Sequence, residues 1–274
     1  MKRTVKFGIV GLAVAATVAV GATALARGAA GWHPGMMKAK VSEHIDGALE
    51  AAHATPAQRE TILAARDRVF AAFEETHQDR GARMARALAL FESDTIDPAA
   101  VGALRDEHRA TAQKVGDALV QAVTEAHDVL SPEQRRAVVE YARSHEPPTG
   151  HLPQHAGFFK RMASHRIDAA LDAAKVDDSQ RARIDAARDR VFAAFEAERP
   201  DPGAHFDEAL SLFAADTIDQ AKVAALRAQH QEVAQRVGDA VVGALQEAHD
   251  VLSPAQRRAV VEFVRARHAE HVAE

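Results

Sequence analysis

Histidine is the residue type in this chain with the most scope for site chemistry, because the sequence has 15 histidines and no cysteine. Neutral imidazole is a common ligand for zinc, copper and nickel ions. Two loose clusters stand out, one of three residues in the middle of the chain and one of two residues near its C-terminus. They are His145, His151 and His155, and His268 and His271. We expect no dedicated cofactor and only weak binding of Zn²⁺, Cu²⁺ or Ni²⁺ at these histidines.

Other histidines lie at positions typical of structural residues. His108 and His230 fall on the apolar stripe of long predicted helices, where we expect buried, hydrogen-bonded side chains. The sequence contains no Gly-rich phosphate loop, no G-x-S-x-G elbow, no H-E-x-x-H pair and no thiol nucleophile. We therefore predict that the protein is not an enzyme.

The elements that position these side chains are encoded twice. Residues 65–74 recur at 187–196 as the same ten letters, ARDRVFAAFE, and residues 130–136 recur at 252–258 with one change. The same offset of 122 positions relates residues 33–146 to residues 155–268 without a gap. A long unit present only twice indicates a covalently fused pair with a pseudo-twofold interface, in contrast to a solenoid of short repeats.

Helical spacing and helix-forming residues run through both repeats, so we predict an all-α fold with four helices in each. In the first repeat they cover about 36–53, 56–90, 98–129 and 132–145, and the second repeat carries the same set 122 positions later. Breaker clusters at 78–81 and 199–203 predict a kink or break in the second helix of each repeat. Residues 147–154 have the proline and glycine content of a linker.

Four helix starts are marked by capping boxes, in which a cap side chain and a Gln three residues later bind each other's backbone N–H. Two of the boxes follow a leucine and have Pro at the first helical position, which needs no N–H. The cap, glutamine and leading leucine residues are Thr55 with Gln58, Leu130 with Ser131 and Gln134, Asp177 with Gln180, and Leu252 with Ser253 and Gln256.

The first 26 residues have the pattern of an export signal. Lys2, Arg3 and Lys6 precede an apolar stretch that ends in Ala24-Leu25-Ala26, a small-residue cleavage site. We expect cleavage near Ala26 and a periplasmic mature protein. The formal net charge of −5 for the whole chain makes nucleic acid an unsuitable partner, because phosphate binding needs a concentrated basic surface.

A Leu-(Ser/Thr)-x-x-Gln motif at the start of a helix, in a secreted Ala-rich helical chain, resembles the Spy/CpxP group of periplasmic proteins. Residues 130–134 and 252–256 carry the motif in full, whereas residues 54–58 and 176–180 lack the leading Leu. The resemblance covers each repeat nearly end to end. It implies a curved antiparallel pair of four-helix units that holds unfolded envelope proteins without ATP during envelope stress.

For client binding we single out apolar pairs at the start of each repeat and one arginine in each. These candidate contacts are Met36, Met37, Phe158, Phe159, Arg66 and Arg188. Two alternatives stay open. The family also includes heavy-metal-sensing relatives, so the His-rich linker and termini favour a metal-binding role as the runner-up, and a third role is restraint of a membrane sensor.

Overall fold

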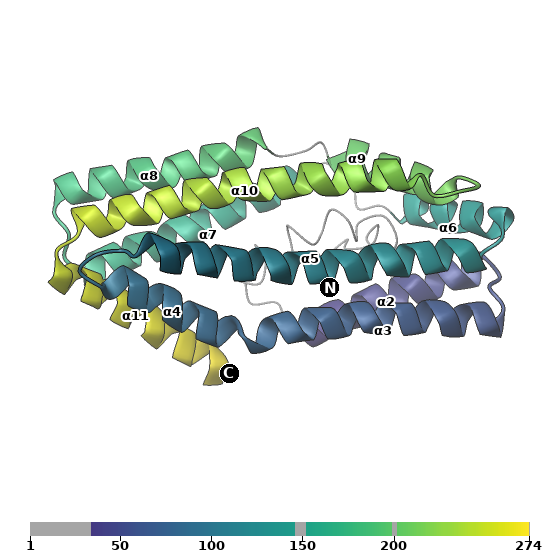
Figure 1. Cartoon of the computed structure of the whole chain (residues 1–274), viewed down its shortest axis with the longest axis horizontal. Helices are drawn as coiled ribbons and strands as arrows, with labels where there is room; N and C mark the ends of the chain where they lie inside the picture. The colour runs from purple at the N-terminus through teal and green to yellow at the C-terminus, as the bar shows by residue number, and fades with distance from the viewer. Residues whose placement is uncertain (1–33, 146–151, 199–201, 274) are drawn as a thin grey trace, which may run out of the picture. The chain divides into compact units, whose positions relative to one another are not determined.

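The computed structural model describes residues 34–145, 152–198 and 202–273 (Figure 1). These residues form helices joined by short turns, with no strand among them, so the prediction of an all-α fold is confirmed. The helices of the first repeat are α2 Pro34–Ala51, α3 Pro56–Gln78, α4 Arg80–Glu92, α5 Pro98–Val129 and α6 Pro132–Ser144. The helices of the second repeat are α7 Leu152–Ala173, α8 Asp178–Ala197, α9 Pro202–Ala214, α10 Gln220–Val251 and α11 Pro254–Ala273.

The predicted second helix of each repeat is divided in two. In the first repeat α3 and α4 are separated at Asp79, and in the second repeat α8 ends at Ala197 before α9 begins at Pro202. The segment between the repeats ends earlier than the predicted linker of residues 147–154, because α7 already begins at Leu152. Pro153 is tolerated there since the first turn of a helix has no internal partner for its N–H groups.

Packing divides the chain into two compact units, and each unit draws on both repeats. Unit 1 contains α2, α3, the part of α5 from Ala110 onward, α6, α9 and the part of α10 up to His230. Unit 2 contains α4, the start of α5, α7, α8, the rest of α10, and α11. Each repeat therefore contributes one short helix, α4 or α9, and the start of the long helix that follows it to the unit built mainly from the other repeat.

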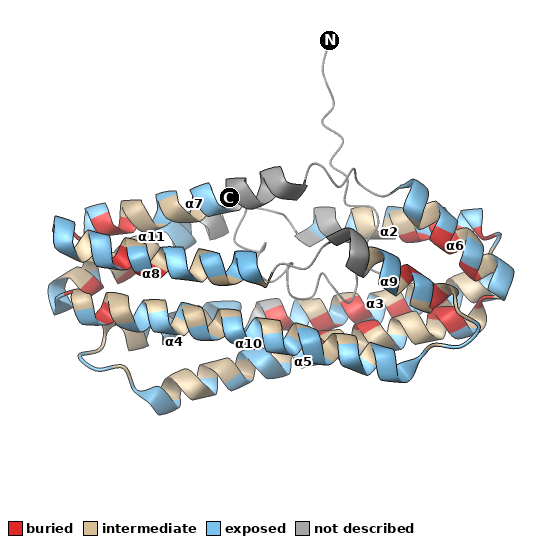
Figure 2. Cartoon of the chain, turned by 90° about the horizontal axis from the view of Figure 1, so that it is seen from above, coloured by how far each residue is buried: buried red, intermediate tan, exposed pale blue. Residues whose placement is uncertain are grey.

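The core of unit 1 shows this exchange most clearly. Leu210 and Phe213 of α9 are 0% and 2% exposed, although α9 belongs to the second repeat. They pack with buried residues of α2, α3, α5 and α6 from the first repeat. In Figure 2 the buried positions of α2, α6 and α9 lie close together. The largest apolar cluster among the described residues is thus completed by a segment about 70 to 170 positions away in the chain.

Unit 2 is assembled in the corresponding way. Phe91 of α4, from the first repeat, packs against a core of Leu171, Ile184 and Leu252 from the second repeat. Helix α4 also packs along α11, as α9 packs along α6 in unit 1. The two cores therefore have the same plan, with the contributing repeats interchanged.

Contacts between the repeats come in pairs related by the same offset of 122 positions. Inside unit 1 these are His127 with Ala215 and Arg227 with Asp117, and inside unit 2 they are His249 with Ser93 and Arg105 with Asp239. Each repeat uses the same positions to hold the other, which is the pattern of a twofold-related pair of subunits. None of the helices in the described ranges has the length and apolar character of a membrane span.

Candidate functional site

The glutamines of the repeated motif bind each other across the chain. Gln58 Nε2 donates to Gln134 Oε1 at 2.8 Å, and Gln134 Nε2 donates back to Gln58 Oε1 at 3.0 Å. Each amide oxygen also accepts the backbone N–H of its own cap residue, Thr55 at 2.8 Å and Ser131 at 2.9 Å. The two capping boxes are thereby joined into one hydrogen-bonded group that fixes the start of α3 against the start of α6.

The second repeat builds the same group. Gln180 and Gln256 exchange hydrogen bonds of 2.9 Å and 2.8 Å. Asp177 and Ser253 cap their helices by accepting the backbone N–H of these two glutamines. Leu130 and Leu252, which precede the full motifs, are both buried in the cores of their units. The motif residues therefore bind one another and pack into the core. This arrangement indicates a structural role for the motif, which holds the starts of two helices together.

Replacing Gln134 with Leu should destabilise the protein by roughly 2 kcal/mol, because the variant loses both amide–amide bonds and the acceptor for Ser131 N–H. Urea denaturation followed by circular dichroism measures the change. Gln256→Leu should have a similar effect in the second repeat, whereas Gln121→Leu on the exposed face of α5 should change the free energy of unfolding by about 0.5 kcal/mol or less. Equal changes in the free energy of unfolding for the Gln134 and Gln121 variants would contradict this structural role.

A buried histidine and a buried arginine hold the exchanged segment in each unit. His127 Nε2 lies 2.9 Å from the carbonyl of Ala215, in the loop after α9. Arg135 Nη1 donates to the carbonyls of His127 and Leu130, which end α5, and its Nη2 lies 4.0 Å from Asp216. His249 and Arg257 make the equivalent contacts in unit 2.

The histidines that the sequence predicts to be buried, His108 and His230, are not the ones that are buried in the structure. His108 is exposed, so its prediction as a buried residue is wrong, and His230 is half-buried with its Nδ1 at 2.7 Å from the carbonyl of Leu226. Among the histidines whose side chains the structure describes, His127 and His249 are the buried ones, each 4% exposed. Their signal was present in the sequence as a His-Asp-Val-Leu-Ser-Pro stretch, which both repeats retain without change.

The structure describes the side chains of only some of the predicted metal-binding histidines. His145 is exposed at the C-cap of α6, and His268 is exposed on α11. His151 lies outside the described residues, as do the side chains of His155 and His271. Within the described part of the chain, no three His, Asp or Glu side chains are grouped so that they could hold a metal ion. A metal role for the linker and terminal histidines remains a prediction.

The two arginines proposed for client contact are paired with carboxylates. Arg66 Nη2 lies 2.9 Å from Asp67, and Arg188 lies 2.8 Å from Asp185 and 3.1 Å from Asp189. These ion pairs neutralise much of the positive charge that the arginines would offer. The side chains of Met36, Met37, Phe158 and Phe159 lie outside the described residues. A role for these six residues in client binding stays a prediction.

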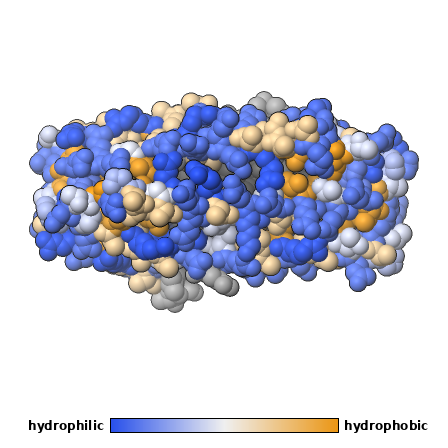
Figure 3. Space-filling model, viewed as in Figure 1, coloured by the Kyte–Doolittle hydropathy of each residue, from blue (hydrophilic) through white to orange (hydrophobic). Residues whose placement is uncertain are grey.

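The structure exposes an apolar surface that the sequence analysis did not single out. Phe195 on α8 is 47% exposed, and Val241 and Leu245 on α10 are 36% and 51% exposed. Val241 and Leu245 are one helical turn apart and so share a face of α10. On the face seen in Figure 3, hydrophobic side chains reach the surface in several separate areas among charged residues.

Two ion pairs place these three residues along the same stretch of the α8 and α10 helices. Arg190 and Arg236 each bridge α8 and α10, Arg190 to Glu247 and Arg236 to Glu198, the latter at 2.6 Å. Phe195 lies between Arg190 and Glu198 along α8, and Val241 and Leu245 lie between Arg236 and Glu247 along α10. We call Phe195, Val241 and Leu245 the unit 2 patch. It is an apolar surface with an ion pair at each end.

The first repeat does not expose the corresponding residues. The counterparts of the patch are Phe73, Leu119 and Val123 in unit 1. Leu119 is 2% exposed, and Phe73 and Val123 are half-buried against apolar neighbours. The helical stripe in the sequence marked both sets of residues as apolar, but a stripe identifies a face without showing what covers it.

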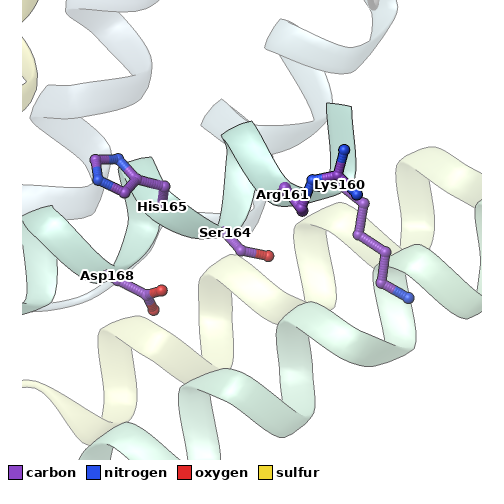
Figure 4. A pocket seen from close by; sticks show the side chains of 5 residues that line it. All are labelled: Lys160, Arg161, Ser164, His165 and Asp168. Carbon is purple, nitrogen blue, oxygen red and sulfur yellow. The ribbon is translucent and has the colours of Figure 1, made fainter. Parts of the chain in front are cut away.

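A shallow hollow of about 460 Å³ lies along α7 and is lined by Lys160, Arg161, Ser164, His165 and Asp168. Figure 4 shows that these side chains point in different directions and do not converge on a common point. Lys160 is already engaged with Glu196 at 3.3 Å, and Asp168 with Arg188 at 3.5 Å. The hollow therefore has no built set of groups for a ligand.

One contact in unit 1 has no equivalent in unit 2. A Cβ atom at Gly47 of α2 would overlap the hydroxyl of Tyr141 on α6 and lie 2.7 Å from its Cζ. The corresponding residues of the second repeat are Ala169 and Phe263, so that repeat has the extra methyl group and lacks the hydroxyl. The two differences compensate each other.

The Gly47→Ala variant should therefore be destabilised by about 1–3 kcal/mol through overpacking. Adding Tyr141→Phe should restore part of the loss, because the double variant has the residue pair found in the second repeat. A double-mutant cycle by urea denaturation gives the coupling between the two positions. If Gly47→Ala cost the same with Tyr141 and with Phe at that position, the contact would not limit packing.

His44, one turn before Gly47 on α2, has both ring nitrogens buried without a hydrogen-bond partner. Burial is the largest cause that lowers its pKa below the ordinary value of 6.5, and the positive charges of His145 and Lys40 lower it further, whereas Glu43 opposes them. The folded state thus favours the neutral ring. The unfolded chain binds a proton more readily, so stability is full above pH 6.5 and is lost as the pH falls below it.

We expect His44→Leu to make the protein less sensitive to acid. The free energy of unfolding of the native sequence should fall more between pH 7 and pH 5 than that of the variant, because the variant has no proton to gain at this position. Urea titrations at both pH values test this. The expectation is contradicted if both proteins lose the same free energy over this range.

The family model described as heavy-metal resistance matches the chain twice, over residues 10–137 and 138–259. No curated protein and no solved structure matches the chain. The two matches follow each other along the sequence, their ends lie 122 positions apart, and together they cover most of its length. The chain therefore belongs to the heavy-metal resistance family and is a tandem duplicated, Spy/CpxP-like member of it.

Proposed function

We propose that this protein is a periplasmic, ATP-independent chaperone-like protein that binds unfolded or misfolded envelope proteins under stress. The observation that carries the proposal is the unit 2 patch, the exposed apolar residues Phe195, Val241 and Leu245 on the ion-paired helices α8 and α10. Exposed apolar clusters on soluble proteins mark interaction surfaces, because an isolated protein gains by burying them. The resemblance to Spy/CpxP proteins supports the same role.

The charges around the patch suit transient binding. The ion pairs Arg190–Glu247 and Arg236–Glu198 place both signs of charge at its ends. A client segment with apolar side chains and nearby charges of either sign finds complementary groups there, and exposed ion pairs rearrange at little cost. Weak contacts of this kind let a client bind, be shielded from aggregation and leave without a chemical energy source.

The proposal includes export. We propose that residues 1–26 direct the chain to the periplasm and are removed near Ala26, which agrees with their basic start and apolar stretch. It assigns no catalytic step to any residue.

Aggregation of a chemically denatured client, followed by light scattering, tests the chaperone role. The chain from Arg27 onward, at a modest molar excess and without nucleotide, should delay and reduce aggregation of several unrelated clients. Serum albumin at the same mass concentration is the control for crowding and surface effects. If scattering with the protein equals scattering with albumin for every client, the protein does not act as a chaperone.

A metal-binding role is the second candidate, and the description of the matched family favours it. In this role the linker and terminal histidines bind Zn²⁺, Cu²⁺ or Ni²⁺. Calorimetric titration should then give a defined stoichiometry that disappears when His145, His151 and His155 are replaced together. A gradual loss with each histidine removed would indicate non-specific chelation.

A further inference from the structure

Two ion pairs fix the register of α8 and α10 in unit 2, where these helices run alongside each other (Figure 1). Arg190 pairs with Glu247 and Arg236 pairs with Glu198, so the two helices are antiparallel over this stretch. The two pairs are about 12 Å apart along α8 and about 16 Å apart along α10, at about 1.5 Å per helical residue. An extended peptide covers this distance with about four or five residues.

The first repeat shows which apolar side chains face each other across these helices. Its α3 and α5 keep one of the two ion pairs at the equivalent positions, and therefore the same register. Phe73 packs there against a buried cluster that contains Leu119. They are the counterparts of Phe195 and Val241. Because the register is the same, Phe195 and Val241 lie on facing sides of α8 and α10, and Leu245 follows one turn further along α10.

One end of the unit 2 patch has an excess of positive charge. Arg183 and Arg190 share a single carboxylate, that of Glu247, so one positive charge is not compensated within this group. Both arginines are exposed, whereas Glu247 is half-buried. A molecule that approaches this end of the patch therefore meets guanidinium groups first.

The other end has an excess of negative charge. Glu198 and Glu232 share a single guanidinium, that of Arg236, at 2.6 Å and 3.6 Å. The hydrogen bond from Arg236 lowers the pKa of Glu198 below its ordinary value, so this carboxylate is ionised at physiological pH. Glu232 is exposed. The patch is therefore apolar in its middle and has charges of opposite sign at its two ends.

Unit 1 lacks this combination. The counterparts of Glu198 and Glu232 are Thr76, which is buried, and Ala110, so the negative end is missing. The apolar middle is covered as well, since Leu119 is 2% exposed. In the part of the chain that the structure describes, the repeats thus provide one such surface and not two.

We propose that the unit 2 patch binds one short client segment in which about four apolar residues lie between an acidic residue and a basic residue. The inference rests on the proposed chaperone function and names the class of client segment that the surface fits. The acidic residue pairs with the arginine end, the basic residue pairs with the glutamate end, and the apolar side chains cover the middle. A segment with the same charge at both ends is repelled at one of them.

Peptide binding to the chain from Arg27 onward, followed by the fluorescence anisotropy of a dansyl label, tests the proposal. Four peptides share the apolar sequence Leu-Val-Phe-Leu and carry Asp and Lys, two Asp, two Lys or two Ser at its ends. We expect one Asp–Lys peptide per chain, bound about three- to tenfold more tightly than either like-charged peptide, with the Ser peptide between them. In about 1 M salt this preference should disappear, because salt screens exposed charges.

Variants of the charged ends should change the preference in opposite directions. Arg183→Gln with Arg190→Gln leaves only a carboxylate at that end, so the peptide with two Lys should become the tightest ligand. Glu198→Gln with Glu232→Gln leaves only a guanidinium at the other end, so the peptide with two Asp should become the tightest. The matched control is Arg68→Gln, which removes the equivalent ion pair of unit 1 and should keep the native preference.

Equal affinity for the four peptides, or an unchanged preference in both charge variants, would overturn the proposal. Two equivalent peptide sites per chain would also overturn it, as would native affinity in the variant with Phe195→Ser, Val241→Ser and Leu245→Ser. Aggregation of a denatured client is a separate measurement on the same protein. If the protein still suppresses aggregation under any of these outcomes, the chaperone function stands and only the assigned client segment is wrong.

Discussion

Replacing Phe213 with Ala should destabilise unit 1 by about 3–5 kcal/mol, the usual cost of removing a fully buried phenylalanine. Phe213 is 2% exposed, contacts the ring of His127 edge-on and lies in the main apolar cluster of that unit. Because it comes from α9 of the second repeat, a large effect on the packing of first-repeat helices is a direct sign of exchange. Urea denaturation gives the total change, and hydrogen exchange locates it.

A matched control is available in the same repeat. Phe195 is 47% exposed, so Phe195→Ala should change the free energy of unfolding by roughly 0.5 kcal/mol. In Phe213→Ala, backbone amides of α2 and α6 should exchange faster, although those helices lie in the other repeat. If the faster exchange were confined to helices of the second repeat, α9 would not be part of the unit 1 core.

The variant with Phe195→Ser, Val241→Ser and Leu245→Ser should lose most of its capacity to suppress aggregation. Each residue offers an exposed apolar surface, and together their burial against a client contributes roughly 2 kcal/mol, or about a thirtyfold change in affinity. Light scattering with increasing amounts of protein should show that far more of the variant is needed. Fold stability should change little, because these side chains are already exposed.

The comparison for this variant is Gln231→Ser with Gln246→Ser, which alters exposed polar residues of α10 and leaves the unit 2 patch intact. We expect that protein to suppress aggregation as well as the native chain does. Equal activity of the patch variant and the polar variant, with both folded, would assign client binding to a different surface.

The sequence predicted where helices begin and end. It did not predict which helices pack against each other. Pro after a cap residue, with Gln three positions on, predicted the start of α6, and the Ser131–Gln134 capping box forms there. Apolar spacing also marked Val115, Leu119 and Ala126, which are buried residues of α5. Such signals act within a few residues, so they are independent of how the helices are later assembled.

The exchange between repeats had no separate signal because the repeats are so similar. Phe91 and Phe213 occupy equivalent positions, and either could in principle pack on its own repeat or on the other. The helical pattern is the same in both cases, since it fixes which residues are buried and not which copy supplies them. The breaker clusters after α3 and α8 did predict interruptions, and it is after these interruptions that α4 and α9 enter the other unit.

The candidate site was harder to predict for a related reason. The unit 2 patch and its less exposed counterparts in unit 1 have nearly the same side chains, so their difference in exposure arises from packing. Likewise, Tyr141 and His145 have Phe263 and Arg267 as their counterparts in the second repeat, and only the structure shows that Tyr141 lies against Gly47 of α2. Differences between two otherwise equal repeats are the most informative positions in this chain.

Cleaving the chain between the two repeats tests most directly whether the repeats exchange α4 and α9. A protease recognition sequence placed within residues 147–151 allows the folded protein to be cut once, and native size-exclusion chromatography then shows whether the halves separate. Because α4 and α9 are buried in the unit built mainly from the other repeat, both fragments should elute together at the size of the uncut protein and separate only in denaturant. Two fragments that elute separately under native conditions would contradict the exchange of helices between the repeats.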